Sequence, residues 1–331
     1  MKKKLLALLL GAAMCLSLAA CGEKADTPDT PDTPSGGDKA AYTVGICQLA
    51  QHEALDAATK GFIDALSEAL PGQVEFEEKN ASGDPNTCST IVNGFVSEGV
   101  DLILANATSP LQAAASATAD IPILGTSVTD YASALELDNW TGTVGGNISG
   151  TSDLAPLDGQ ADMLVELCPD AKNVGLIYCS AEANSKYQVD EMIKLLEAKG
   201  LNCTEFAFTD SNDVASVTQA ACDASDVIFI PTDNTAANNT EAIANVVLPS
   251  KTPVIAGEQG ICKGCGIATL SIDYYELGTI TGRMAAKILT GEADISTMPI
   301  EFAPNVTKMA NAANCEALGI AVPEGYEMLE G

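Results

Sequence analysis

Short apolar segments alternate with amphipathic segments along most of the chain, and the alternation occurs in two successive series. The first series has apolar segments at 42–49, 73–80, 101–107 and 121–128, separated by segments of helical period at 52–70, 84–99 and 109–120. The second has apolar segments at 173–180, 203–208, 226–232 and 253–258, separated by helical segments at 183–200, 211–224 and 239–249. Strands that alternate with helices in this way predict parallel sheets wrapped by helices. The expected fold is therefore α/β, with two Rossmann-like lobes.

The third units of the two series resemble each other. Residues 101–110 read DLILANATSP and residues 226–235 read DVIFIPTDNT. Both begin with aspartate, continue with apolar or small residues, and end in hydroxyl or amide groups where a helix is expected to begin. Ligands of open α/β sheets bind beyond the carboxyl ends of the strands, so a cleft between two facing lobes is the expected ligand site.

Polar side chains stand where the predicted strands end, and these are the candidate ligand-binding residues. In lobe one they are Gln51, His52, Thr108, Ser109, Ser127, Thr129 and Asp130. In lobe two they are Glu182, Asn184, Ser185, Asp233, Asn234, Thr235 and Glu258. Any one of them is also a plausible helix cap, because Ser, Thr, Asp and Asn are preferred at helix starts. The set as a whole carries more information than its members.

The charges of this set favour a zwitterionic ligand. The pair Ser109-Pro110 places a hydroxyl and free N–H groups at a helix start, which suits a carboxylate. The acidic side chains of the facing lobe suit an ammonium group. Only two lysines, Lys186 and Lys263, lie near these loops, and the loops contain no arginine. The site therefore has too few cations to bind a phosphate or polycarboxylate well.

The first residues predict export. Three lysines precede an apolar run that ends near Ala20, and this order is typical of a secretory signal. The small residues before Cys21 resemble the bacterial lipobox, a signal that implies cleavage before the cysteine and lipidation of its thiol. An ordinary signal peptide with an incidental cysteine is the alternative. Residues 22–40 repeat Thr-Pro-Asp and contain no apolar cluster, so a disordered tether is expected there.

Composition argues against nucleic-acid binding and gives little support to catalysis. The formal net charge is −29, and no basic patch is visible. His52 is the only histidine, and neither a G-x-S-x-G elbow, a P-loop nor a G-x-G-x-x-G fingerprint is present. We therefore expect neither a cofactor nor an enzyme, with His52 a ligand-contacting or capping residue.

The spacing of the cysteines does not predict a set of disulfide bonds. Nine of the eleven lie beyond residue 40, and an odd number cannot pair completely within one molecule. The pair Cys262 and Cys265 in CKGC lacks the further ligands of a structural zinc site. A local disulfide and two free thiols both remain open for it.

Several segments together resemble the substrate-binding lipoproteins of ABC importers in the tryptophan and tyrosine group. They are VGICQLAQHEALDAATKGFIDAL, DLILANATSPLQAAASATADIPI, GNISGTSD, VGLIYCSAEANS, VIFIPTDNT and ATLSIDYYELGTITGRMAAKIL, and the match covers nearly all of residues 42–320 in order. The resemblance implies a type I periplasmic-binding fold with a three-crossing hinge. It implies crossings near 147–153, near 273–274 and after Pro299, and a helix at 275–289 that returns to lobe one.

The resemblance also implies the domain organisation and the biological role. Residues 1–20 would be a signal peptide, 21–41 the lipidated cysteine and tether, 42–149 with 274–300 lobe one, and 150–273 with 301–331 lobe two. The protein would be exported, anchored by lipid to the outer face of the cell membrane, and would deliver an aromatic or other apolar L-amino acid to an ABC permease and its ATPase. A ligand-sensing module of a signalling system with the same fold is the alternative.

Trp140 departs from the pattern of the family. It lies in LELDNWTGTVGGN, where the family more often has a proline-glycine stretch. Its ring would either stack on a ligand or cover the edge of a lobe, and we favour the second.

Overall fold

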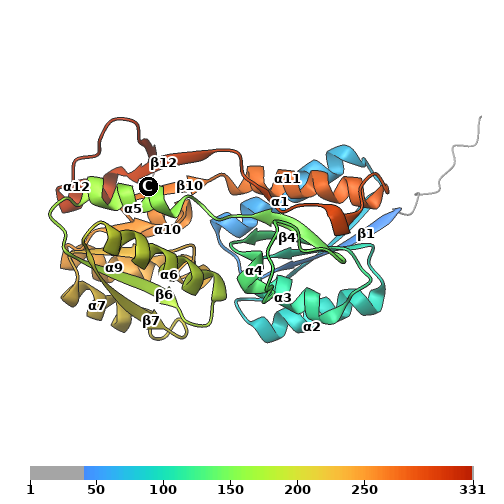
Figure 1. The fold of residues 1–331 in the computed structure, drawn as a ribbon, viewed down its shortest axis with the longest axis horizontal. Coiled ribbons are helices and arrows are strands. Elements are labelled where there is room, and N and C mark those ends of the chain that lie inside the picture. Colours follow the sequence, from blue (N-terminus) through green and yellow to red (C-terminus); the bar gives the residue numbers. More distant parts are fainter. Residues whose placement is uncertain (1–40, 330–331) are drawn as a thin grey trace, which may run out of the picture. The chain divides into compact units, whose positions relative to one another are not determined.

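The computed structural model describes residues 41–329, which all fall within one compact unit that contains two β-sheets (Figure 1). The predicted signal peptide, Cys21 and the tether lie outside the described residues. Each sheet and its helices form one lobe. The α/β architecture with two mostly parallel sheets confirms the fold class predicted from the sequence.

The first sheet is wholly parallel and has the strand order β11-β5-β4-β3-β1-β2. Its strands are β1 (Tyr42–Gln48), β2 (Val74–Asn80), β3 (Leu102–Asn106), β4 (Ile123–Val128), β5 (Ile148–Ser152) and β11 (Glu301–Phe302). Strand β1 lies between β3 and β2, with Gln48 opposite Asn106 and Asn80. The carboxyl ends of these three strands are therefore aligned at one edge of the sheet.

Helices cover both faces of the first sheet. They are α1 (Glu53–Ala69), α2 (Pro85–Glu98), α3 (Thr108–Ala117), α4 (Tyr131–Ala134), α11 (Tyr274–Leu289) and the short 3₁₀ helix η1 (Ile295–Thr297). Val44 and Ile46 pack toward α1 and α11, whereas Cys47 belongs to the core beneath α2 and α3. Figure 1 shows these two pairs of helices on opposite sides of the sheet. Burial on both faces explains why the inner strands β1, β3 and β4 are mostly apolar.

The second sheet has the order β13-β12-β10-β9-β8-β6-β7 and is parallel except for the pair β10–β12. Its strands are β6 (Asn173–Cys179), β7 (Asn202–Phe208), β8 (Val227–Ile230), β9 (Val254–Ala256), β10 (Ala268–Ile272), β12 (Val306–Asn311) and β13 (Glu327–Leu329). Its helices are α5 (Leu157–Leu167), α6 (Ala183–Ala198), α7 (Val214–Ala224), α8 (Asn234–Ala237), α9 (Thr240–Ser250), α10 (Gln259–Gly264) and α12 (Ala312–Leu318). One buried cluster lies beneath α5, α6 and α12, and another beneath α7, α9 and α10.

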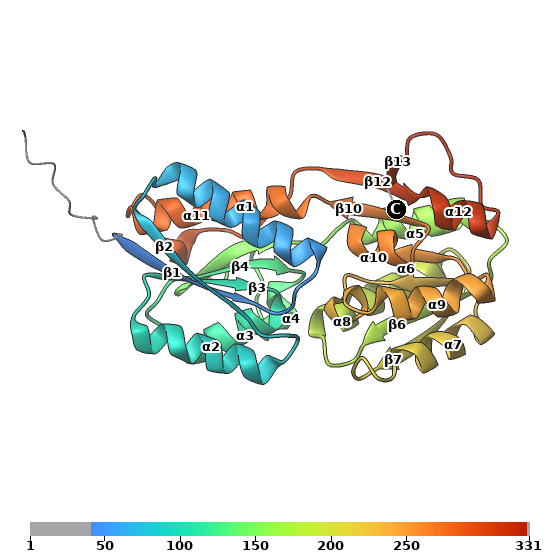
Figure 2. The same cartoon turned by 180° about the vertical axis from the view of Figure 1, so that it is seen from behind.

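The chain passes between the sheets three times. It leaves the first sheet after Ser152, returns after Ile272 into α11, and leaves again after Phe302 into β12. The first sheet thus extends to Ser152 and includes residues 301–302, whereas the sequence placed the lobe boundaries at 149 and 300. Figure 2 shows α11, β10 and β12 along one side of the molecule.

The return of α11 to lobe one depends on a close approach of two helix backbones. Gly278 of α11 lies against α1, and a Cβ built at Gly278 would lie 1.9 Å from the carbonyl oxygen of Ala58. A side chain at this position would separate the two helices. Glycine therefore sets how closely α11 can pack on α1.

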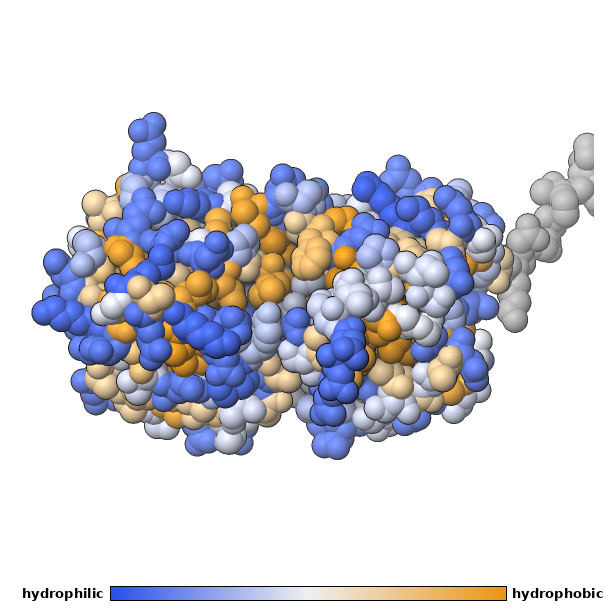
Figure 3. All heavy atoms as spheres, viewed as in Figure 1, coloured by the Kyte–Doolittle hydropathy of each residue, from blue (hydrophilic) through white to orange (hydrophobic). Residues whose placement is uncertain are grey.

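The surface is mainly hydrophilic on the face drawn in Figure 3, with scattered apolar residues. The large exposed apolar side chains include Trp140, Phe302 and Val306. No helix within residues 41–329 has the length and apolar character needed to cross a membrane.

Candidate ligand-binding cleft

A cavity of about 560 Å³ lies where the strand ends of the two lobes come together. Ligand pockets commonly have volumes of a few hundred Å³. Five of the residues predicted from the sequence line this cavity, two from lobe one and three from lobe two: Gln51, Ser109, Glu182, Asn234 and Thr235. The strand-end rule therefore brings residues together that lie more than 100 positions apart in the chain.

The start of α3 has no side-chain cap. Ala107 precedes it with φ 103°, and no side chain accepts from the first N–H groups of the helix. Thr108 in the first turn is buried, and Ser109 lines the cavity. The N–H groups at this end, together with the helix dipole, form an environment that favours an anion.

Ser127 lies next to this helix start. It follows Thr126, which pairs with Asn106 across β3 and β4, and Ala107 N–H donates to the Thr126 carbonyl oxygen at 3.0 Å. Ser127 has φ 53°, only 6% of its surface is exposed, and its hydroxyl has no hydrogen-bond partner within the described residues. Strained backbone and unsatisfied buried polar groups are concentrated at functional sites.

Glu182 organises the loop that begins α8. Its Oε1 accepts from the N–H and hydroxyl of Thr235, both at 2.8 Å, and its Oε2 accepts from the N–H and the amide of Asn234 at 3.0 and 2.7 Å. Asn184 also donates to Glu182 at 3.2 Å. This carboxylate therefore holds Asn234 and Thr235 in position at the cavity wall.

Asp233 and Glu258 are buried helix caps. Asp233 accepts from Cys179 N–H at 2.6 Å and from Ala236 N–H at 2.7 Å, and Ser185 is a further hydrogen-bond partner. Burial, followed by the nearby charge of Glu182, raises the pKa of Asp233 to about 7. Glu258 accepts from the first N–H groups of α10, and burial raises its pKa as well. Both side chains thus have the capping role that the sequence left open for them.

His52 reaches across from lobe one to lobe two. Its Nε2 lies 3.1 Å from Oδ1 of Asn234. A second cavity of about 350 Å³ opens beside it and is lined by His52, Glu53 and Glu258 among others. His52 therefore contacts lobe two directly, in addition to preceding α1.

Thr129 contacts Asp153, an aspartate that was not among the predicted site residues. The Thr129 hydroxyl donates to Oδ1 of Asp153 at 2.9 Å, and the Tyr274 hydroxyl donates to Oδ2 at 3.0 Å. Asp153 is only 3% exposed, and burial raises its pKa. The neighbouring Asp130 instead caps α4 through Ser133 N–H.

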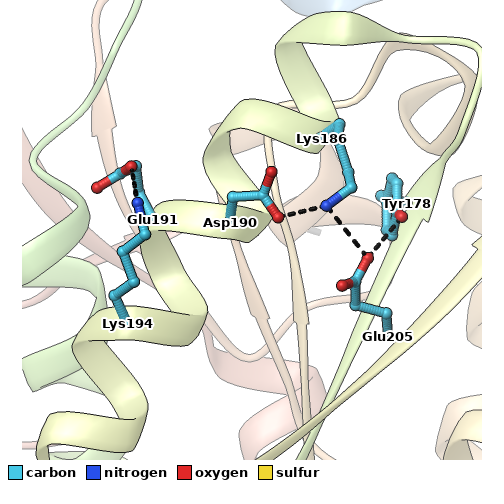
Figure 4. Close-up of polar contacts among 6 residues, drawn as sticks. All are labelled: Tyr178, Lys186, Asp190, Glu191, Lys194 and Glu205. Carbon is cyan, nitrogen blue, oxygen red and sulfur yellow. Dashed lines mark hydrogen bonds and ion pairs between the residues drawn. The ribbon is translucent and has the colours of Figure 1, made fainter.

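The lysines nearest to the cleft are already paired with surface acids. Lys186 forms ion pairs with Asp190 and, at 3.6 Å, with Glu205, which also accepts from the Tyr178 hydroxyl (Figure 4). Lys263 lies 3.7 Å from Glu53. Within residues 41–329, no lysine or arginine nitrogen lies within 4.0 Å of the buried carboxylates of Asp153, Glu182, Asp233 and Glu258. These buried acids therefore have no lysine or arginine partner in the described part of the chain. Burial raises the pKa values of Asp153 and Glu258, and the nearby charge of His52 acts in the opposite direction on both.

Several further residues that line the main cavity were not predicted from the sequence. They follow the second strand of each lobe or lie near α8: Asn80, Ser82, Thr209, Asp210, Ser211, Asn238 and Asn239. The same strand-end rule, applied to β2 and β7, would have found most of them.

Two further questions that the sequence left open, on Trp140 and on the CKGC cysteines, have structural answers. The Trp140 ring stacks on Tyr131 with the planes 4° apart and the centroids 6.5 Å apart, and Tyr131 belongs to the core of lobe one. Trp140 therefore covers lobe one. Cys262 and Cys265 are buried free thiols. No group of three or more metal-ligating side chains comes together in the part of the chain that the structure describes.

Comparison with known proteins agrees with this architecture. Residues 43–328 match a family described as "ABC transporter substrate binding protein". A tyrosine-binding protein from Clostridioides difficile is 32% identical over 320 residues, which cover 96% of this chain and 92% of that protein.

Two solved structures are similar over nearly their whole length. The first is a Streptococcus pneumonia ABC domain in complex with L-Trp, with 30% identity, a TM-score of 0.83, and coverage of 88% of this chain and all of that one. The second is a ligand-free, open structure of a Clostridium difficile substrate-binding protein with adhesive properties, with 35% identity, a TM-score of 0.68, and coverage of 87% and 99%.

Proposed function

The chain belongs to the family of ABC transporter substrate-binding proteins, and we propose that it captures an L-amino acid with an aromatic or other apolar side chain in the cleft between its lobes. Relatives that are named for tyrosine or that contain L-Trp support this ligand class. The chemistry of the cleft supports the zwitterionic part of the ligand independently.

The observation that carries the proposal is the unpartnered hydroxyl of Ser127 beside the uncapped start of α3. A buried hydroxyl without a partner costs roughly 1–3 kcal/mol. A ligand carboxylate placed here would accept from this hydroxyl and from the first N–H groups of the helix. It would satisfy donors that the folded chain leaves open.

The predicted site residues divide into two groups in this proposal. Those that would contact the ligand are Gln51, His52, Ser109, Ser127, Asn234 and Thr235. Those that would hold the contacting residues in place are Thr108, Thr129, Asp130, Glu182, Asn184, Ser185, Asp233 and Glu258. For Thr108 the division follows from burial. For the others in the second group it follows from the hydrogen bonds described above, by which they cap helices or orient loops.

The acidic character of the cleft supports an ammonium group on the ligand. Asp153, Glu182, Asp233 and Glu258 are buried near the facing strand ends without a lysine or arginine partner among the described residues, and Glu182 lines the main cavity. Buried charges in proteins are normally paired. A ligand cation would supply the missing partner, whereas a sugar would not.

Closure of the two lobes around the ligand would present a surface to an ABC permease with its ATPase. We further propose that the mature protein is held at the outer face of the cell membrane by a lipid on Cys21. Replacing Cys21 by serine should leave uncleaved or released protein. Membrane retention of a cleaved Cys21→Ser variant would refute the lipid anchor.

Calorimetry with the twenty amino acids, one hexose and one nucleoside tests the ligand class. We expect heat from one or a few aromatic or apolar L-amino acids and none from the others. Heat from the sugar or the nucleoside alone would refute the proposal.

A further inference from the structure

Asp153 differs from the three buried carboxylates of lobe two in what its oxygens contact. Each oxygen of Asp153 accepts one hydrogen bond, and both donors are side-chain hydroxyls, from Thr129 and Tyr274. A carboxylate can accept about four hydrogen bonds. Asp153 therefore keeps acceptor capacity on both oxygens.

The lobe-two carboxylates are used more completely. Glu182 accepts four bonds from Asn234 and Thr235, and Asp233 and Glu258 each accept backbone N–H groups at helix starts. Backbone N–H groups satisfy a carboxylate in place and hold it there. These three residues therefore have less need of a ligand cation than Asp153 has.

The position of Asp153 also fits a ligand group next to a bound carboxylate. Its N–H donates to the carbonyl oxygen of Val128 at 3.3 Å, and Val128 directly follows Ser127. The unpartnered Ser127 hydroxyl and the Asp153 carboxylate thus both lie at the end of β4. The carboxylate and ammonium groups of an α-amino acid are attached to one carbon, so their two subsites must be close together.

We propose that Asp153 binds the ammonium group of the amino acid, in place of the lobe-two acids that the sequence suggested. The inference rests on the proposed function. Asp153 lies immediately after the first crossing strand, and its partner Tyr274 lies at the second crossing. An ammonium group on Asp153 would therefore contact the hinge itself.

Replacing Asp153 by asparagine tests the assignment, because this change keeps the shape and removes the charge. The probes are L-tyrosine and L-tryptophan, each with its counterpart that lacks the amino group. We expect the dissociation constant of the amino acid to rise roughly 10- to 100-fold, as for loss of a charged hydrogen bond. The counterpart without the amino group should bind the Asp153→Asn variant as well as it binds the wild type.

Asp233→Asn is the matched control, since Asp233 is an equally buried carboxylate that caps α8. It should affect the amino acid and its counterpart to the same extent. Equal binding of the amino acid to Asp153→Asn and wild type would overturn the assignment. A loss of both ligands together in Asp153→Asn would also overturn it, because that result indicates a structural role.

A structure of the wild-type complex tests the assignment without any variant. The ligand nitrogen is expected within about 3.2 Å of an Asp153 oxygen. A nitrogen placed against Glu182 or Asp233 would overturn the inference and leave the proposed function intact. If none of the twenty amino acids binds the wild-type protein, the proposed function and this inference both fail.

Discussion

His52 and Asn234 join the two lobes through one hydrogen bond, with Nε2 of the imidazole 3.1 Å from Oδ1 of the amide. Because Oδ1 is an acceptor, the imidazole must carry its proton on Nε2. The Asn234 amide group donates in turn to Glu182 at 2.7 Å, which fixes its orientation. The bond therefore ties the first loop of lobe one to a rigid loop of lobe two.

His52→Ala should weaken ligand binding, because the arrangement of the lobes that encloses the ligand would lose a stabilising contact. Asn234→Ala should weaken it for the same reason. If both act through this bond, the double variant will lose less than the sum of the two, with a coupling of about 0.5–1.5 kcal/mol. Calorimetry on the four proteins measures the coupling.

Gln259→Ala is the control for that cycle. Gln259 also spans the lobes, through a 3.3 Å bond to the exposed side chain of Glu53. Its effect should add to that of His52→Ala, since the two contacts share no partner. If the losses of binding free energy in His52→Ala and Asn234→Ala add exactly in the double variant, the hydrogen bond between the two residues does not contribute to binding.

The unfolding free energy should decrease as pH rises from about 4 to about 7. The pKa of Asp233 is about 7 in the folded protein against an ordinary value of 3.8, and burial also raises the pKa values of Asp153 and Glu258. The folded state then binds protons that the unfolded state has released, so stability is lost as pH rises through the folded pKa. Each such group contributes at most about 1.4 kcal/mol per pH unit.

Denaturant unfolding over this pH range measures the slope. The strongly negative net charge of the chain contributes repulsion in the same direction. Asp233→Asn removes one buried carboxyl group. The unfolding free energy of this variant should depend less steeply on pH between about pH 4 and 7, by the contribution of that single group. An unchanged slope in that variant would contradict a raised pKa for Asp233.

Gly278→Ala should destabilise lobe one. The new Cβ would lie 1.9 Å from the Ala58 carbonyl oxygen, so α11 would have to move away from α1. Overpacking of this kind typically costs about 1–3 kcal/mol. Thermal or denaturant unfolding measures the loss.

Gly94→Ala is the matched control within a helix. Gly94 lies in α2, and a Cβ there meets no atom within 4 Å. Alanine at such a position should stabilise the protein by up to about 1 kcal/mol, because glycine has the poorer helix propensity. A similar effect of both substitutions would show that the α1–α11 contact does not matter for stability.

The sequence predicted the repeated βα units well because their periodicity is local. The segments 73–80 and 183–200, for example, correspond to β2 (Val74–Asn80) and α6 (Ala183–Ala198). The short strands β11 and β13 were not predicted, because they are too short to show an apolar period. The two-residue strand β11 pairs with β5, and the three-residue strand β13 pairs with β12 at the edge of its sheet. Their positions are determined by the sheet edges they join.

The site was predictable as a region but not in the role of each acid. Residues that follow parallel strands lie at one edge of their sheet, and the cavity lies where these edges of the two lobes come together. Ser109 and Asn234 therefore line the same cavity. Whether a carboxylate caps a helix depends on side-chain geometry, and the structure shows this role for Asp233 and Glu258. Asp153 was missed because its partners, Thr129 and Tyr274, lie 24 and 121 positions away.

Ser127→Ala should separate stability from binding. The Ser127 hydroxyl is buried and has no partner within the described residues, so its removal should leave the ligand-free protein as stable or raise its unfolding free energy by about 1 kcal/mol. Alanine keeps the same backbone strain at φ 53°, which makes the comparison a clean one. The amino acid should bind more weakly, by about 5- to 100-fold if a charged hydrogen bond is lost. A variant that loses stability and keeps its affinity would instead assign Ser127 to the scaffold of lobe one.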